Sequence, residues 1–114
     1  MNESTVNVKH ITQGEFETEV TRCTNAVVAD FYATWSGPCR ELSPLLDRLA
    51  GDYADKVKFV KINVDESPGI AQNFQAGQLP VVIFFKDGKV AGRITTVPTE
   101  ADLKARLDAF ANGK

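Results

Sequence analysis

The chain has 114 residues, of which 25% are charged and 43% hydrophobic, and its formal net charge is −2. A domain of this size buries roughly two-thirds of its unfolded surface, enough for a core without structural metal. The basic residues are scattered among acids, which excludes the clustered positive charge of nucleic-acid binders. The longest apolar run, 81–85, is far shorter than the ~20 residues that cross a bilayer. We therefore expect one soluble domain, 1–114, that binds neither nucleic acid nor a membrane.

The chain contains two cysteines, Cys23 and Cys39, and one histidine, His10. These residues are too few for a disulfide scaffold or a four-ligand zinc site, so no metal is expected. The first five residues are polar and lack the apolar stretch of a signal peptide. The sequence therefore predicts a cytoplasmic location, where thiols stay reduced.

The spacing of apolar residues predicts nine helices and strands, and proline, glycine and capping residues mark where they begin and end. In chain order they are strand 6–9, helix 12–21, strand 26–33, helix 38–53, strand 57–64, helix 67–74, strand 81–85, strand 90–95 and helix 99–110. Thr12 and Glu15 have the spacing of a capping box, and Ser67 and Thr99 are expected to be N-caps. Pro44 is expected to kink the second helix. Asp87-Gly88 predicts a hairpin turn, because it supplies the positive φ that such turns need.

The order of these elements is β-α-β-α-β-α-β-β-α. Strands separated by helices imply a parallel part of the sheet, and the hairpin imposes an antiparallel part. We therefore predict an α/β fold with a mixed central β-sheet and helices on both faces. Sites in such sheets form beyond the carboxyl ends of strands, where loops lead into helix N-termini, and the segment 32–39 lies at such a place.

The segment 30–39 reads Asp-Phe-Tyr-Ala-Thr-Trp-Ser-Gly-Pro-Cys. It resembles the active-site segment of the thioredoxin family, whose usual motif is Trp-Cys-Gly-Pro-Cys. Further matches follow in order along nearly the whole chain: Asp30, Pro44, Lys61, Leu79-Pro80 and Lys86-Asp87-Gly88. The resemblance implies a thioredoxin fold and a monomer without cofactor that exchanges dithiols and disulfides. It also implies disulfide-containing target proteins and a thioredoxin reductase as partners.

Ser36 stands where the family has its attacking cysteine. In thiol–disulfide exchange a thiolate attacks a disulfide sulfur, and a serine hydroxyl is a poor nucleophile toward sulfur. By resemblance, Cys39 is the resolving cysteine, so the chain as given is predicted to lack dithiol turnover. Ser36 also fits the N-cap of the following helix. Serine-hydrolase chemistry is disfavoured, because no sequence signal brings His10, the one histidine, to the site as a general base.

The resemblance assigns roles to residues outside the motif as well. Asp30 matches the proton acceptor of the resolving thiol, and Lys61 matches the lysine that modulates it. A carboxylate in a buried strand should have a raised pKa, although Asp30 could also simply satisfy local hydrogen bonds. The Leu79-Pro80 bond matches a cis-proline segment whose backbone is free to pair with an extended substrate. Substrate contacts are expected from Trp35, Gly37, Pro38, Leu79, Pro80 and Thr96.

Two positions depart from the family pattern near the expected groove. Val81 stands where threonine is common after the cis-proline, and Thr96 stands where a loop glycine is expected. Both changes are expected to alter the width of the groove. An apolar rim is expected from Trp35, Pro80 and the loop 95–97.

Two other functions stay open from the sequence. One is a redox-silent binding module that holds a polypeptide in the groove of Trp35 and Pro80, and the other is monothiol chemistry at Cys39, such as glutathionylation. A bridge between Cys23 and Cys39 is rejected. The strand between them separates them by roughly 25 Å, whereas a disulfide needs Cα atoms within about 7 Å. Cys23 is expected to be a packing or loop residue.

Overall fold

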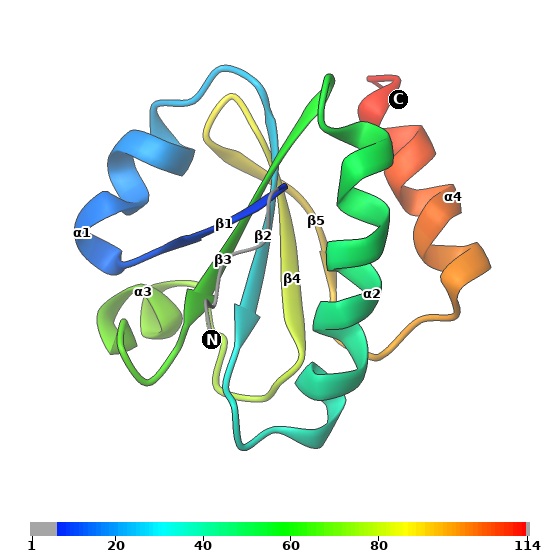
Figure 1. Cartoon of the computed structure of the whole chain (residues 1–114). Coiled ribbons are helices and arrows are strands. Elements are labelled where there is room, and N and C mark those ends of the chain that lie inside the picture. The colour runs from blue at the N-terminus through cyan, green and yellow to red at the C-terminus, as the bar shows by residue number, and fades with distance from the viewer. Residues whose placement is uncertain (1–6, 114) are drawn as a thin grey trace.

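The computed structural model describes residues 7–113. In chain order its elements are β1 (Val8–Ile11), α1 (Gln13–Phe16), η1 (Glu17–Thr21), β2 (Ala26–Tyr32), α2 (Gly37–Tyr53), β3 (Val57–Asn63), α3 (Pro68–Asn73), β4 (Val81–Lys86), β5 (Lys89–Ile94) and α4 (Glu100–Ala111). The predicted order of strands and helices is confirmed (Figure 1). Among the described residues, no helix is long and apolar enough to cross a membrane.

Two predictions for the N-terminal part need correction. The first strand was expected at 6–9, but β1 ends at Ile11, because Ile11 pairs with Ile62 of β3 and is buried. Val6 lies outside the described residues. The helix expected at 12–21 is α-helical only in its first turn. It continues as the π-helix η1, in which the Arg22 N–H donates to the Glu17 carbonyl five residues earlier, at 2.8 Å.

The five strands form one mixed sheet in the order β1-β3-β2-β4-β5. β3 pairs in parallel with both β1 and β2, whereas β4 runs antiparallel to β2 and β5. The central strand, β2, is buried at all seven positions, as its apolar sequence predicts.

Helices cover both faces of this sheet: α2 and α4 lie on one face and α1 and α3 on the other (Figure 1). Successive residues of β2 serve opposite faces. Val28 packs in the cluster that contains Leu42 and Leu107 of the α2 and α4 face, and Phe31 packs in the cluster that contains Phe16. Asp30 follows Val28 by two residues and therefore points toward α2.

Local signals for turns and helix starts mostly act as predicted. Asp87 and Gly88 adopt φ of 52° and 78° at the hairpin, and a Cβ on Gly88 would clash with the Thr21 carbonyl oxygen. Thr99 caps α4 by accepting from the Asp102 N–H at 3.1 Å.

The predicted signals at two other positions act differently. α2 runs continuously through Pro44. Ser67 precedes α3, but its hydroxyl makes no cap bond there and serves α1 instead.

Candidate functional site

The motif 35–39 lies where β2 ends and α2 begins. Ser36 is the N-cap of α2, with extended backbone, and its Oγ accepts from the Cys39 N–H at 3.4 Å. Pro38 lies in the first turn, where a missing N–H disrupts no helical hydrogen bond. Ser36 and Cys39 are only 5% and 2% exposed. The predicted capping role of Ser36 is confirmed, and the Cys39 thiol is covered by the fold.

Trp35 lies on the surface beside this buried pair. It is 64% exposed, and its indole N–H donates to Asp65 Oδ2 at 2.8 Å. The Asp65 N–H in turn donates to Asn63 Oδ1 at 2.8 Å, which fixes the loop after β3. The sequence argument missed Asp65, although a carboxylate at the end of a strand next to β2 is a usable signal in a parallel sheet.

Asp30 lies beneath α2 and is almost completely buried, at 3% exposure. The Ser43 hydroxyl donates to its Oδ2 at 2.7 Å, while its Oδ1 has no hydrogen-bond partner among the described residues. Burial raises the pKa of Asp30 to about 6; the Ser43 hydrogen bond opposes this shift, Asp47 adds to it and Lys61 opposes it. The expectation of a raised pKa is confirmed.

Lys61 stands opposite Asp30 in the register of β2 and β3 and is buried. Its Nζ lies 5.8 Å from the centroid of the Tyr32 ring. Among residues 7–113 it forms no ion pair with Asp30. Its charge lowers the pKa of both Asp30 and Asp47, the second of which is raised mainly by burial. Lys61 therefore acts on the two carboxyl groups through space.

Cys39, Ser43 and Asp47 follow one another at intervals of four residues on one face of α2. All three line a pocket of about 450 Å³, together with Tyr32, Ala33, Thr34, Arg40 and Pro44. Ser43 thus connects this pocket to the buried carboxylate of Asp30. The sequence argument missed Ser43 and Asp47, and their helical spacing from Cys39 is the signal that finds them.

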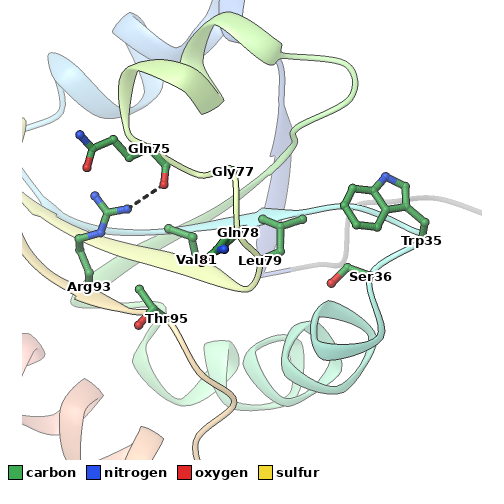
Figure 2. A pocket seen from close by; sticks show the side chains of 9 residues that line it. All are labelled: Trp35, Ser36, Gln75, Gly77, Gln78, Leu79, Val81, Arg93 and Thr95. Atoms are coloured by element: carbon green, nitrogen blue, oxygen red, sulfur yellow. Dashed lines mark hydrogen bonds between the residues drawn. The ribbon is translucent and has the colours of Figure 1, made fainter.

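A second pocket, here called the groove, has a volume of about 670 Å³ and is shown in Figure 2. Its lining comes from Trp35 and Ser36, the segment before β4, the first residue of β4 and the edge strand β5 with the residue that follows it: Gln75, Gly77, Gln78, Leu79, Val81, Arg93 and Thr95. The Leu79-Pro80 peptide is cis, as predicted. The predicted contacts of Trp35 and Leu79 with this space are consistent with the structure.

Other residues expected at the groove do not line this pocket. Pro80 is buried and does not form part of the wall, and neither do Gly37 and Pro38 in the first turn of α2. Thr96 and Val97 line a neighbouring pocket against α4, because the chain turns toward Thr99 after β5. Thr95 is the residue of that loop that reaches the groove. The sequence argument missed Arg93, which shares a strand face with Thr95.

The remaining candidates lie outside this site. Cys23 follows η1 and packs against the cluster on the α1 and α3 face, and both cysteines are free thiols. His10 on β1 contacts Glu66 Oε1 at 2.9 Å. Within residues 7–113 no group of three or more His, Cys, Asp or Glu side chains is placed to hold a metal ion.

Comparison with known proteins agrees with this arrangement. The thioredoxin family model matches residues 7–109. The thioredoxin of Acidithiobacillus ferridurans is 32% identical over 102 residues, which cover 90% of this chain and 94% of that protein. Thioredoxin 1 of Synechococcus elongatus is 36% identical over 98 residues, 86% of this chain and 92% of that protein.

The chloroplastic thioredoxin M4 of Arabidopsis thaliana is 37% identical over 105 residues, 92% of this chain. The match spans 54% of that longer protein. The predicted thioredoxin fold, with its mixed five-stranded sheet between helices, is thereby confirmed. This chain belongs to the thioredoxin family.

Proposed function

We propose that the chain is a thiol–disulfide oxidoreductase scaffold whose first reacting group is replaced by Ser36, so that it receives target polypeptides without completing dithiol turnover. The observation that carries this proposal is the placement of Ser36 at the N-cap of α2, three residues before the buried Cys39 thiol. A helix N-terminus stabilises a thiolate at that position. The hydroxyl of Ser36 instead accepts the Cys39 N–H.

The complete reaction needs two thiols. A thiolate at position 36 attacks one sulfur of the target disulfide, forms a mixed disulfide and releases the other target sulfur as a thiolate. Cys39 then loses its proton and attacks the sulfur at position 36, which forms an intramolecular disulfide and releases the second target sulfur. The target gains two electrons and two protons. With Ser36 the first bond does not form, because a hydroxyl with a pKa far above neutrality supplies no sulfur nucleophile.

Asp30 is suited to take the proton that Cys39 releases in the second step. Its pKa of about 6 lies nearer to neutrality than that of an ordinary carboxyl group, and its Oδ1 is not occupied by a hydrogen bond from the described residues. Lys61 is proposed to tune this acceptor through space, as its effect on the pKa of Asp30 supports.

A redox-silent binding module is the second candidate, and the exposed Trp35 beside the groove favours it. Both proposals use the same groove for an extended polypeptide. Monothiol chemistry is less well supported, since Cys39 is 2% exposed.

Replacing Ser36 by cysteine separates the two main candidates. We expect S36C to catalyse reduction of the insulin disulfides by dithiothreitol well above the rate with dithiothreitol alone. The unmodified chain and the matched control S36A should both stay at that uncatalysed rate. A folded S36C variant without catalysis would contradict the oxidoreductase origin and favour the binding module.

A further inference from the structure

The groove contains a single formal charge, that of Arg93. The rest of its lining is aromatic, apolar or uncharged and polar. Figure 2 shows Arg93 and Gln75 at one end and Trp35 and Ser36 at the other. A polypeptide segment that lies along the groove therefore contacts the Trp35 ring and Ser36 at one end and the Arg93 guanidinium group at the other.

The guanidinium of Arg93 is held in place but not neutralised. Its Nη2 donates to the carbonyl oxygens of Phe74 at 2.8 Å and Gln75 at 3.5 Å, at the end of α3. Among residues 7–113 no carboxylate forms an ion pair with it. A guanidinium carries five N–H donors, so Nε and Nη1 remain available to another acceptor. Because the side chain is already fixed, an anion binds there at a small entropic cost.

The pocket adjacent to the groove is lined by a second arginine, Arg106, and by one acid, Asp102. Arg106 of α4 donates from Nη2 to the Arg93 carbonyl at 3.4 Å, and its guanidinium lies 5.2 Å from the centre of the Phe84 ring. Asp102 lines the adjacent pocket together with these two arginines and is the one acid of that wall. In this lining two arginines stand against one acid, a balance that favours the approach of a carboxylate.

We propose that the groove selects extended polypeptide segments with an aspartate or glutamate side chain that reaches Arg93, while the reacting part of the segment lies against Trp35 and Ser36. This inference rests on the proposed function, in which the groove receives a target polypeptide. Arg93 then determines which targets bind, because a carboxylate accepts a charge-assisted hydrogen bond from a free guanidinium N–H. Neutral and basic segments lose that charge-assisted bond.

Trp35 provides a direct probe of the proposal. It is the only tryptophan of the chain and lines the groove, so its fluorescence reports occupancy. The titrants are nine-residue peptides of serine, alanine and glycine with a central valine, in which one glutamate is moved through the flanking positions. A parallel panel carries glutamine instead. We expect at least one glutamate peptide to bind about fivefold more tightly than its glutamine counterpart at low salt, and the difference to shrink in high salt.

Variants assign that preference to Arg93. R93Q should abolish it and R93K should keep part of it, because lysine retains the charge. The matched control is R48Q, which removes an exposed arginine of α2 that lines neither the groove nor the adjacent pocket. If R93Q does not fold, R93K still tests the assignment, because the preference for glutamate should be weaker in R93K than in the unmodified chain. Three results would overturn the inference. They are equal binding of the glutamate and glutamine panels, a preference for glutamate that persists in R93Q, and the absence of a fluorescence change with every peptide. These outcomes are independent of turnover by S36C, which tests the proposed function itself.

Discussion

At the scale of single residues, Asp30 shows how the fold accommodates a carboxyl group that has almost no contact with solvent. The Ser43 hydroxyl satisfies one oxygen, and the through-space charge of Lys61 favours the ionised form, but neither cancels the effect of burial. The pKa therefore remains raised, at about 6. A group in this state weakens the fold when it is ionised, and its pKa is suited to accepting a proton near neutral pH.

Replacing Asp30 by asparagine should stabilise the protein at alkaline pH. Between the ordinary pKa of 3.8 and the folded value of about 6, the folded state holds a proton that the unfolded chain releases. The contribution of Asp30 to stability is therefore retained below about pH 4 and lost as the pH rises through about 6. A shift of this size corresponds to about 3 kcal/mol. We expect D30N to raise the free energy of unfolding by up to this amount at pH 8 and to change it little at pH 4.

Urea unfolding of both proteins at the two pH values measures the effect. Asp47 also has a pKa raised by burial, but it is present in both proteins, so its contribution largely cancels in the difference. The asparagine Oδ1 still accepts from Ser43, which keeps the hydrogen bond in place. A difference between the two proteins that is the same at pH 4 and pH 8 would contradict the assignment of the raised pKa to Asp30.

At the scale of elements, the two helices on one face of the sheet cap each other. The Ser67 hydroxyl, just before α3, accepts from the Gln13 N–H in the first turn of α1 at 3.0 Å. The Gln13 side chain accepts from the Gly69 N–H in the first turn of α3, also at 3.0 Å. Each short helix thus satisfies a free N–H of the other. This pairing fixes the position of α3, whose following residues form one wall of the groove.

Replacing Ser67 by alanine should destabilise the protein by about 1–2 kcal/mol, because it removes a fully buried hydroxyl and leaves the Gln13 N–H without its acceptor in a partly buried hydrogen bond. The matched control is T99A, which removes an exposed cap of α4. We expect a smaller loss there, about 0.5–1 kcal/mol. Urea unfolding measures both losses of stability, as shifts of the midpoint when the dependence of the unfolding free energy on urea concentration is unchanged. A loss in S67A no greater than that in T99A would show that the mutual capping adds nothing.

At the scale of the whole molecule, the element order was predictable because apolar spacing, caps and turn residues are local signals. The extent of β1 was not, since pairing with β3 decides where that strand ends. The position of Asp30 followed from a single acid in an apolar strand. Three contacts were not predicted: the Ser43 hydrogen bond to Asp30, the acceptance of the Gln13 N–H by Ser67, and the bonds from Arg93 to the carbonyl oxygens after α3. Each contact joins segments that only the folded chain brings together, so no local pattern encodes the contact, although helical spacing from Cys39 places Ser43 on the face of α2 that lines the pocket.

The whole fold also controls access to the two thiols. Cys23 is half-buried, whereas Cys39 is 2% exposed and is covered where α2 packs on the sheet. Cys39 lines the pocket beside Ser43, but its low exposure leaves little of the thiol within reach of a reagent in the folded state. With 5,5′-dithiobis(2-nitrobenzoic acid) near neutral pH, we expect one fast thiol and one at least about tenfold slower.

The variant C23S identifies the slow thiol as Cys39, because it should retain the slow phase alone. In concentrated urea the remaining thiol should react as fast as a thiol of an unfolded chain, since no packing then protects it. Native C23S that reacts at this unfolded rate would contradict the protection by α2. Such a result would also favour monothiol chemistry at Cys39, because a reagent from solvent would then reach the thiol without opening the fold.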